Sequence, residues 1–424
     1  MRFPGHRIAK HYFPVTKKRS RVGVSQDDES RPWNLLGLDQ IVVDVEVKGS
    51  PDLLEELGLV AGESVLWDDE ILSRWRERLN REACRVSAGG AVGNTVNNFT
   101  YLSGEPATLL GAIGDGIRPG EPAFQYVAQT PGAVDLGRLR SVPGSIATAF
   151  TFIGPEGDRT FAVAPGISNE YPEEELPLEV VRQAPAVLTT LYCLRDPAWP
   201  IAQAAERMMR EAKDAGVPVA LGMGTAGLVR ERQAYAVDLL KQYVNLAAMN
   251  ADEAEALTGE QDALLACRKL LDWVDLVIIT EGDRGLTMGG WVDERYKRQT
   301  DQKIRSKSIP EYNRYEYSRL MCSADCPDPL KVFSHIHPYR GGPDRLKNTN
   351  GAGDAALAAV LHDICANRYH RTTVPESDKH AAPVEFLTYS SLSRIAQYGN
   401  RVAYEVLKGN SPRLNAPVGP DEEG

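Results

Sequence analysis

Five short apolar segments alternate with helix-like stretches along the middle of this chain. The apolar segments are residues 107–113, 186–194, 217–221, 244–249 and 276–279. Segments of this length and composition, bounded by Gly, Pro or Asn, are typical of strands buried on both faces of a parallel sheet. Helical stretches lie between several of them, at residues 201–215, 251–257 and 263–273. The alternation predicts an α/β fold, a three-layer α/β/α sandwich with a mainly parallel central sheet.

Other segments do not fit this alternation and predict a small separate sheet. Residues 43–47 alternate apolar and polar side chains at a period of two, which indicates a strand with one covered face. Residues 146–153 and 160–164 are strand-like and are joined by a turn-rich linker, so they predict a β-hairpin. We expect lid elements at about 41–48, 83–88 and 146–164 to cover a cleft.

The rest of the chain sets the domain boundaries. Residues 1–33 are polar and lack periodicity, so we expect an N-terminal arm before one domain at 34–415. A short tail, 416–424, follows it. Residues from about 290 to 345 are rich in Arg, Lys, Tyr, Pro and Asp with weak periodicity, and are expected to be a long insertion.

Charge and composition exclude several classes of partner. The chain carries 58 acidic against 48 basic residues, a formal net charge of −10, so its overall field would repel a nucleic acid. No apolar stretch is long enough to cross a membrane and no signal-peptide core is seen at the N-terminus. The six cysteines lack disulfide-framework spacing. We therefore expect a cytoplasmic protein that binds small molecules, and a homodimer is compatible with the sequence.

The segment from Asn348 to Asp354, NTNGAGD, carries the strongest chemical signal. It precedes a stretch, 355–361, that is apolar almost all round and therefore predicts a buried helix. Glycines before a helix let a ligand approach the backbone, and the free N–H groups there favour an anion such as a phosphoryl group. Asp354 would stand beside that anion and could accept the proton of an attacking hydroxyl. The alternative is an aspartate that only caps the helix.

A second glycine motif supports the interpretation of the NTNGAGD segment as a phosphoryl-transfer site. Residues 85–95, RVSAGGAVGNT, place paired glycines after a strand-like run and Asn94 at the start of a helical stretch. This motif resembles the first glycine signature of the ribokinase-like (PfkB) carbohydrate and nucleoside kinases, and the GAGD segment resembles their second. Two such motifs in the family's order are far more specific than one. The resemblance implies a ribokinase-like fold and ATP as the phosphoryl donor.

The resemblance also implies roles at the acceptor side of the site. Asp354 would take the proton of the acceptor hydroxyl, and the backbone of Gly351, Ala352 and Gly353 would form the anion hole. Asp44 would hold the sugar hydroxyls together with Gly89, Gly90 and Asn94. Asp39 is a competing candidate for the sugar contact, and Asp44 read by itself could be a solvent-facing strand residue.

At the nucleotide side, three more segments match the family. Asn250 and Glu253 resemble its N-x-x-E motif and would organise hydrated Mg²⁺, with Glu253 acting through water. Thr280, Gly282 and Gly285 resemble its nucleotide loop, and Asn400 lies in a segment like the helix that flanks the ATP base. The alternatives are a helix cap with a first-turn acid at 250–253 and a plain turn at 280–285.

Longer segments of the sequence narrow the choice of substrate. Seven segments resemble the members of the family that phosphorylate the 5′-hydroxyl of inosine and guanosine: residues 3–15, 37–46, 89–95, 246–260, 334–344, 348–364 and 400–407. Adenosine or a free sugar, ribose or fructose, is the alternative substrate. A binding protein without activity is the alternative from another class, although such a protein would not need Asp354. The family usually has Asp where this chain has Asn348, beside its monovalent-cation site, and this leaves a K⁺ requirement open.

Overall fold

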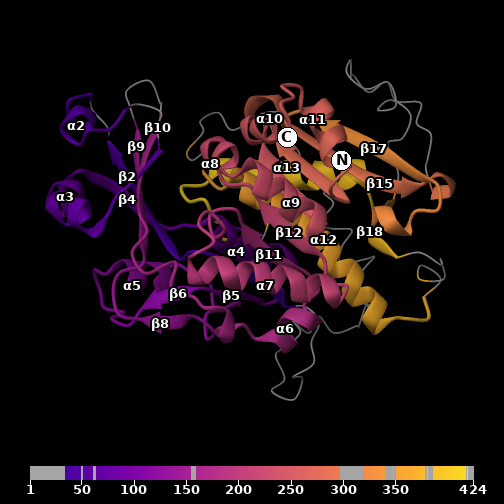
Figure 1. Ribbon diagram of the computed structural model, residues 1–424, viewed down its shortest axis with the longest axis horizontal. Coiled ribbons are helices and arrows are strands. Elements are labelled where there is room, and N and C mark those ends of the chain that lie inside the picture. Colours follow the sequence, from indigo (N-terminus) through magenta and orange to yellow (C-terminus); the bar gives the residue numbers. More distant parts are fainter. Residues whose placement is uncertain are drawn as a thin grey trace.

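Two sheets of different size organise the computed structural model of this chain. It describes residues 34–48, 51–60, 64–153, 159–296, 319–339, 347, 350–377, 380, 385–416 and 418. Figure 1 shows the larger sheet among most of the helices, and the smaller sheet with two helices at one end of the molecule. The small-sheet end is the indigo and purple part on the left of the view.

The larger sheet contains eleven of the described strands. Along its hydrogen-bonded path they are β18 (Phe386–Ser391), β16 (Arg319–Met321), β15 (Leu286–Asp293), β14 (Leu276–Thr280), β13 (Leu246–Asn250), β12 (Val219–Gly222), β11 (Val187–Thr190), β1 (Leu35–Leu38), β5 (Ala107–Leu110) and β7 (Val134–Asp135), with β17 (Pro329–Ile336) paired to β15. Every pair from β14 to β7 is parallel, and β15 to β18 add antiparallel strands at the other edge. The predicted mainly parallel sheet is confirmed.

Helices cover both faces of this sheet and give the predicted three layers. One face packs against α4 (Ala91–Ser103), α12 (Ala352–Thr373) and α13 (Leu392–Lys408). The other packs against α6 (Leu178–Gln183), α7 (Pro200–Asp214), α8 (Ala226–Glu231), α9 (Gln233–Gln242), α10 (Ala251–Thr258) and α11 (Ala263–Leu270). Alternate residues of one strand serve opposite layers: Ile278 faces the first set and Ile279 the second. This two-sided burial accounts for the continuous apolar runs in the sequence.

The smaller sheet contains the predicted lid strands. Its order is β3 (Ser64–Leu66), β10 (Arg159–Ala164), β9 (Ala147–Ile153), β2 (Val42–Lys48) and β4 (Ala83–Ala88), with α2 (Pro51–Glu56) and α3 (Asp69–Glu82) beside it. β9 and β10 pair antiparallel, as expected of the hairpin, and its linker, 154–158, lies outside the described residues. Val43, Val45 and Val47 are buried, in agreement with the period of two.

Smaller elements complete the chain. They are α5 (Pro122–Ala128), the strand pair β6 (Ala112–Gly114) and β8 (Arg140–Val142), and the 3-10 turns η1 (Glu173–Glu175), η2 (Gly282–Arg284), η3 (Glu294–Tyr296) and η5 (Ser323–Asp325).

The segment expected to be an insertion, 290–345, contributes strands to the larger sheet. The end of β15 and the whole of β16 and β17 fall within it. β17 pairs with β15 along its whole length, from Pro329 opposite Asp293 to Ile336 opposite Leu286. Residues 297–318 and 340–346 lie outside the described part of the chain, as do the arm 1–33 and the tail residues 417 and 419–424.

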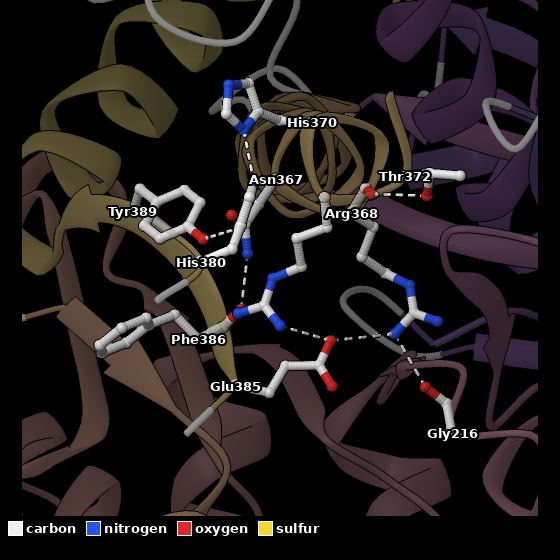
Figure 2. A network of polar contacts seen from close by, with 10 residues as sticks. Gly216, Asn367, Arg368, His370, Thr372, His380, Glu385, Phe386 and Tyr389 are labelled. Atoms are coloured by element: carbon white, nitrogen blue, oxygen red, sulfur yellow. Dashed lines mark hydrogen bonds and ion pairs between the residues drawn. The ribbon is translucent and has the colours of Figure 1, made fainter. Parts of the chain in front are cut away.

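The far end of α12 is tied to β18 and to a neighbouring loop, as Figure 2 shows. The Asn367 side chain and the Arg371 guanidinium both donate to the Phe386 carbonyl oxygen, and Arg371 pairs with Glu385 at 3.1 Å. Arg368 donates to the Gly216 carbonyl oxygen at 2.8 Å. These contacts attach the carboxyl end of α12 to β18 and to the loop at Gly216. Neither α12 nor any other helix in the described ranges is long and apolar enough to span a membrane.

Candidate active site

Strand ends and the start of α12 meet at one edge of the larger sheet. Asp39 follows β1, Asn250 ends β13, and Thr280 ends β14 directly opposite Asn250. A Cβ added to Gly353 would lie 3.9 Å from the Thr280 Oγ1, so the first turn of α12 lies beside β14. In open α/β sheets, ligands bind at the carboxyl ends of the parallel strands.

The first turn of α12 presents backbone amides at this edge. Gly351 precedes the helix with φ of 79°, a left-handed conformation that favours glycine, and no side chain caps the helix at this residue. A Cβ on Gly351 would also lie 2.5 Å from the Pro412 carbonyl oxygen. Ala352 and Gly353 follow as the first helical residues. Amides at a helix start form an anion site of the kind predicted for this segment.

Asp354 lies in that first turn and contacts the other glycine motif. Its Oδ2 accepts a hydrogen bond from the Asn94 Nδ2 at 2.9 Å, so the two motifs meet although they are distant in the sequence. Burial raises the pKa of Asp354 to about 7, against the Asn94 hydrogen bond, which lowers it. The carboxylates of Asp39 and Asp44 raise this pKa further, and the Arg413 guanidinium lowers it. A carboxyl group with a pKa near neutrality is suited to general-base work.

The two candidate sugar ligands differ in their surroundings. Asp39 is buried, and its Oδ2 accepts from the Val92 amide at 3.0 Å while its Oδ1 accepts from Thr190 at 3.0 Å and from the Cys193 thiol at 3.2 Å. Asp44 is half-buried on β2, and within the described ranges its carboxylate has no hydrogen-bond donor. Burial raises the pKa of Asp44 to about 7, and Arg413 lowers it. Asp44 therefore has free acceptor capacity for a ligand, whereas three donors already occupy the Asp39 carboxylate.

Of the paired glycines Gly89 and Gly90, the first leaves space for the side chain of Asp44. A Cβ on Gly89 would lie 2.4 Å from the Asp44 carboxyl carbon, so only glycine leaves room for this side chain. Gly90 has φ of 80° and precedes α4, whose Val92 amide is the one held by Asp39. Asn94 follows on the first turn of α4 and is buried. The first motif thus brings Asp44, Asn94 and Asp39 to one place.

Asn250 and Glu253 form a capping box at the start of α10. The Asn250 Oδ1 accepts from the Glu253 amide at 2.8 Å, and Glu253 accepts from the Asn250 amide and side chain at 3.0 and 2.8 Å. The helix cap that the alternative predicted is therefore present. Burial raises the pKa of Glu253 to about 8, and the negative charge of Asp354 raises it further. A buried carboxyl group such as that of Glu253 could hold a hydrated divalent cation through one of its water ligands.

The predicted nucleotide loop forms a tight turn after β14. Gly282 and Gly285 have φ of 60° and 107°, and a Cβ on Gly285 would lie 2.1 Å from the Ile336 carbonyl oxygen. Asn400, on α13, donates to the next carbonyl oxygen, that of His337, at 2.9 Å. Gly285 and Asn400 therefore flank the same end of β17. Asn348 lies outside the described residues.

Two residues that sequence reasoning missed lie near Asp354. The Arg413 guanidinium is buried and donates to Asn94 and Gly89. Tyr192 follows β11, and burial together with the nearby charges of Glu253 and Asp354 raises its pKa. Tyr192 belongs to a run that predicted only a buried strand, and Arg413 lies in an aperiodic segment after the last helix, so neither had a local signal.

Comparison with known proteins agrees with this geometry. Residues 69–299 match the model of the pfkB family carbohydrate kinases. The chain is 43% identical to a guanosine-inosine kinase of Escherichia coli strain K12, over 98% of this chain and 96% of that protein.

Solved structures show the same fold at low sequence identity. An adenosine kinase from Sinorhizobium meliloti superposes with a TM-score of 0.67 at 18% identity, covering 91% of this chain and 97% of that one. An adenosine kinase from Schistosoma mansoni in complex with 2-fluoroadenosine gives 0.63 at 14% identity, covering 92% and 99%. A probable sugar kinase from Rhizobium etli CFN 42 gives 0.64 at 16%, covering 91% and 96%.

Proposed function

The chain belongs to the pfkB family of carbohydrate kinases, and from this premise we propose that it transfers the terminal phosphoryl group of ATP to the 5′-hydroxyl of guanosine and inosine. As a kinase it is a phosphotransferase with an alcohol group as acceptor, and the family implies ATP as co-substrate, usually with Mg²⁺. The products would be GMP or IMP and ADP. The relative named as a guanosine-inosine kinase, which matches almost the full length of the chain, supports this choice of acceptor.

One observation carries the proposal: the contact between Asp354 and Asn94 at the amide-bearing end of α12. It joins a proton acceptor, an anion site and the sugar-side glycine motif. A carboxylate, amides and a second carboxylate with free acceptor capacity are the groups that phosphoryl transfer to a vicinal diol-bearing sugar needs. A protein that only binds nucleosides would not need the first of them.

The roles follow from these positions. Asp44 would accept hydrogen bonds from two ribose hydroxyls, since a carboxylate can accept from both. Asp354 would take the proton of the 5′-hydroxyl as its oxygen attacks the terminal phosphorus, and the bond from that phosphorus to the bridging oxygen of ADP would break. The amides of 351–353 would stabilise the charge on the phosphoryl oxygens. Glu253 would hold a water ligand of Mg²⁺, which neutralises charge on the ATP phosphates when bound.

A comparison of acceptors tests the substrate. Guanosine and inosine are expected to give kcat/KM values at least about tenfold above those of adenosine and ribose, because the binding energy of the purine adds to that of the ribose. Steady-state assays at equal concentrations, with ADP release as the readout, measure this. A higher kcat/KM for ribose would reject the nucleoside assignment but not the kinase assignment, and a higher value for adenosine would reject the choice of purine.

The rate is expected to depend on pH near neutrality. Burial raises the pKa of Asp354 to about 7, and a protonated carboxyl group cannot accept the proton of a hydroxyl. The value of kcat/KM should therefore fall about tenfold per unit as the pH drops below about 7, and level off above it. A pH profile of kcat/KM for guanosine tests this. An acid limb near pH 4, the ordinary pKa of an aspartate, would contradict the role of burial.

A further inference from the structure

A short segment after the last helix inserts a buried cation between the two glycine motifs. We call residues 411–414 the C-terminal strap. Its Arg413 is 6% exposed and lies over the ring of Tyr126, with 4.9 Å between the guanidinium carbon and the ring centroid. The guanidinium donates to the Asn94 Oδ1 at 3.0 Å, to the Gly89 carbonyl oxygen at 2.8 Å and to Thr130 at 3.1 Å. A buried arginine with three acceptors from different elements has a fixed orientation.

The strap is built into both motifs. A Cβ on Gly93 would lie 2.7 Å from the Arg413 Nη2, so the first motif leaves space for the guanidinium. In the second motif, Gly351 leaves space for the Pro412 carbonyl oxygen. The Leu414 amide donates to the Asn98 Oδ1 at 2.7 Å, and the Asn97 Nδ2 donates to the Leu414 carbonyl oxygen at 3.1 Å. These bonds hold the strap along α4.

The contact of Arg413 with Asn94 determines which way the Asn94 amide points. A guanidinium can only donate, so the Asn94 oxygen must face Arg413. The Asn94 NH₂ group must then face Asp354, to which it donates at 2.9 Å. Without Arg413 the amide could turn over and present its oxygen to the Asp354 carboxylate, which would repel an ionised group and favour a protonated one.

We propose that Arg413 is a positioning residue for phosphoryl transfer, which fixes the Asn94 amide so that it holds Asp354 in place as an ionised proton acceptor. The proposal rests on the function proposed above. Its action on Asp354 is indirect, because the contact between them runs through Asn94. The positive charge of Arg413 and the hydrogen bond from Asn94 both lower the pKa of Asp354.

Negative charges surround Asp354, and Arg413 opposes their effect on its pKa. Asp39 after β1 and Asp44 on β2 both raise the pKa of Asp354, and Glu253 on α10 is close enough for its own pKa to be raised by Asp354. Arg413 is the positive charge that lowers the pKa of Asp354 and of Asp44. Replacing Arg413 would remove this charge and would also release the Asn94 amide, whose hydrogen bond lowers the pKa of Asp354 more strongly than the charge does, so the pKa of Asp354 should rise.

The test compares pH profiles of Arg413→Gln and Arg413→Lys with the wild type, using the full chain, guanosine and ATP. Arg413→Gln should lower kcat/KM at pH 7 by about tenfold or more, move its acid limb upward by about one unit or more, and regain activity at higher pH. Arg413→Lys keeps the charge but not the planar fork, so its acid limb should move less while kcat falls. Arg182→Gln, in an exposed ion pair on α6, is the control and should match the wild type.

A structural role alone would give a different result. A folded Arg413→Gln protein with lower kcat and an unmoved acid limb would overturn the proposal, with the thermal unfolding midpoint as the check on folding. If Arg413→Gln does not fold, the Arg413→Lys variant is the test of the proposal. A kcat of Arg413→Lys equal to that of the wild type would then overturn the proposal. Failure of the proposed function is distinct, because the wild type would then not phosphorylate guanosine, and the same profiles could be run with the acceptor that it does phosphorylate.

Discussion

Asp354→Asn is expected to lower kcat on the order of 10³-fold while the dissociation constant of guanosine stays within about tenfold. The substitution keeps the shape of the side chain but removes the proton acceptor. The amide oxygen of the variant can still accept the hydrogen bond from Asn94, so the loss of kcat reports the missing proton acceptor. An interaction made in the transition state affects kcat and leaves ground-state binding almost unchanged.

Steady-state kinetics and isothermal titration with guanosine measure the two quantities separately. Asp238→Asn, on the exposed surface of α9, is the matched control and should retain kcat within about twofold, as is usual for surface substitutions. Turnover of Asp354→Asn equal to that of the control would show that another group accepts the proton.

Replacement of Asp44 is expected to lower activity without loss of stability, and replacement of Asp39 is expected to lower stability. Asp44→Asn should lower kcat/KM by about 10²–10⁴-fold, since each hydrogen bond from a ribose hydroxyl to a carboxylate contributes roughly 1.5–3 kcal/mol. Its unfolding midpoint should be unchanged or raised, because burial raises the pKa of Asp44 to about 7 and so disfavours the ionised group. The site gains substrate affinity from a residue that the fold itself does not need.

Asp39→Asn should instead lower the free energy of unfolding, by about 1–3 kcal/mol. Both Asp39 oxygens accept hydrogen bonds, from Val92 on one side and from Thr190 and Cys193 on the other. An amide would turn its NH₂ group toward one of these donors. Urea unfolding beside guanosine kinetics distinguishes the pair: a larger loss of kcat/KM in a fully stable Asp39→Asn protein than in Asp44→Asn would exchange their roles.

Much of the fold could be predicted from the sequence because its central strands are buried on both faces. The runs that form β5 and β11 to β14 are continuous and apolar, a pattern that few structures besides a doubly covered parallel sheet produce at this length. The antiparallel edge has no such signal. β17 is partly exposed and includes Pro329, Lys331 and His335. Because these residues interrupt the apolar pattern, the sequence did not predict a strand in the segment expected to be an insertion.

The sequence predicted only those residues of the candidate site that belong to a local sequence motif. Glycines before a helix and an acid in its first turn are visible in the sequence, so the contact between Asp354 and Asn94 joins two residues that their motifs predict. The choice between Asp39 and Asp44 was not visible, since it depends on which carboxylate the tertiary structure supplies with donors. Arg413 was invisible for the same reason: its partners lie on α4 and in the loop before it, far away in the chain.

The most direct test is a structure of the protein with guanosine and a non-hydrolysable ATP analogue. We expect an Asp354 oxygen within about 2.6–3.2 Å of the 5′-oxygen, the Asp44 carboxylate at the ribose hydroxyls, and the terminal phosphate of the analogue at the first amides of α12. A nucleoside whose 5′-oxygen lies beyond hydrogen-bond reach of Asp354, with the phosphates away from that helix, would contradict the proposed mechanism.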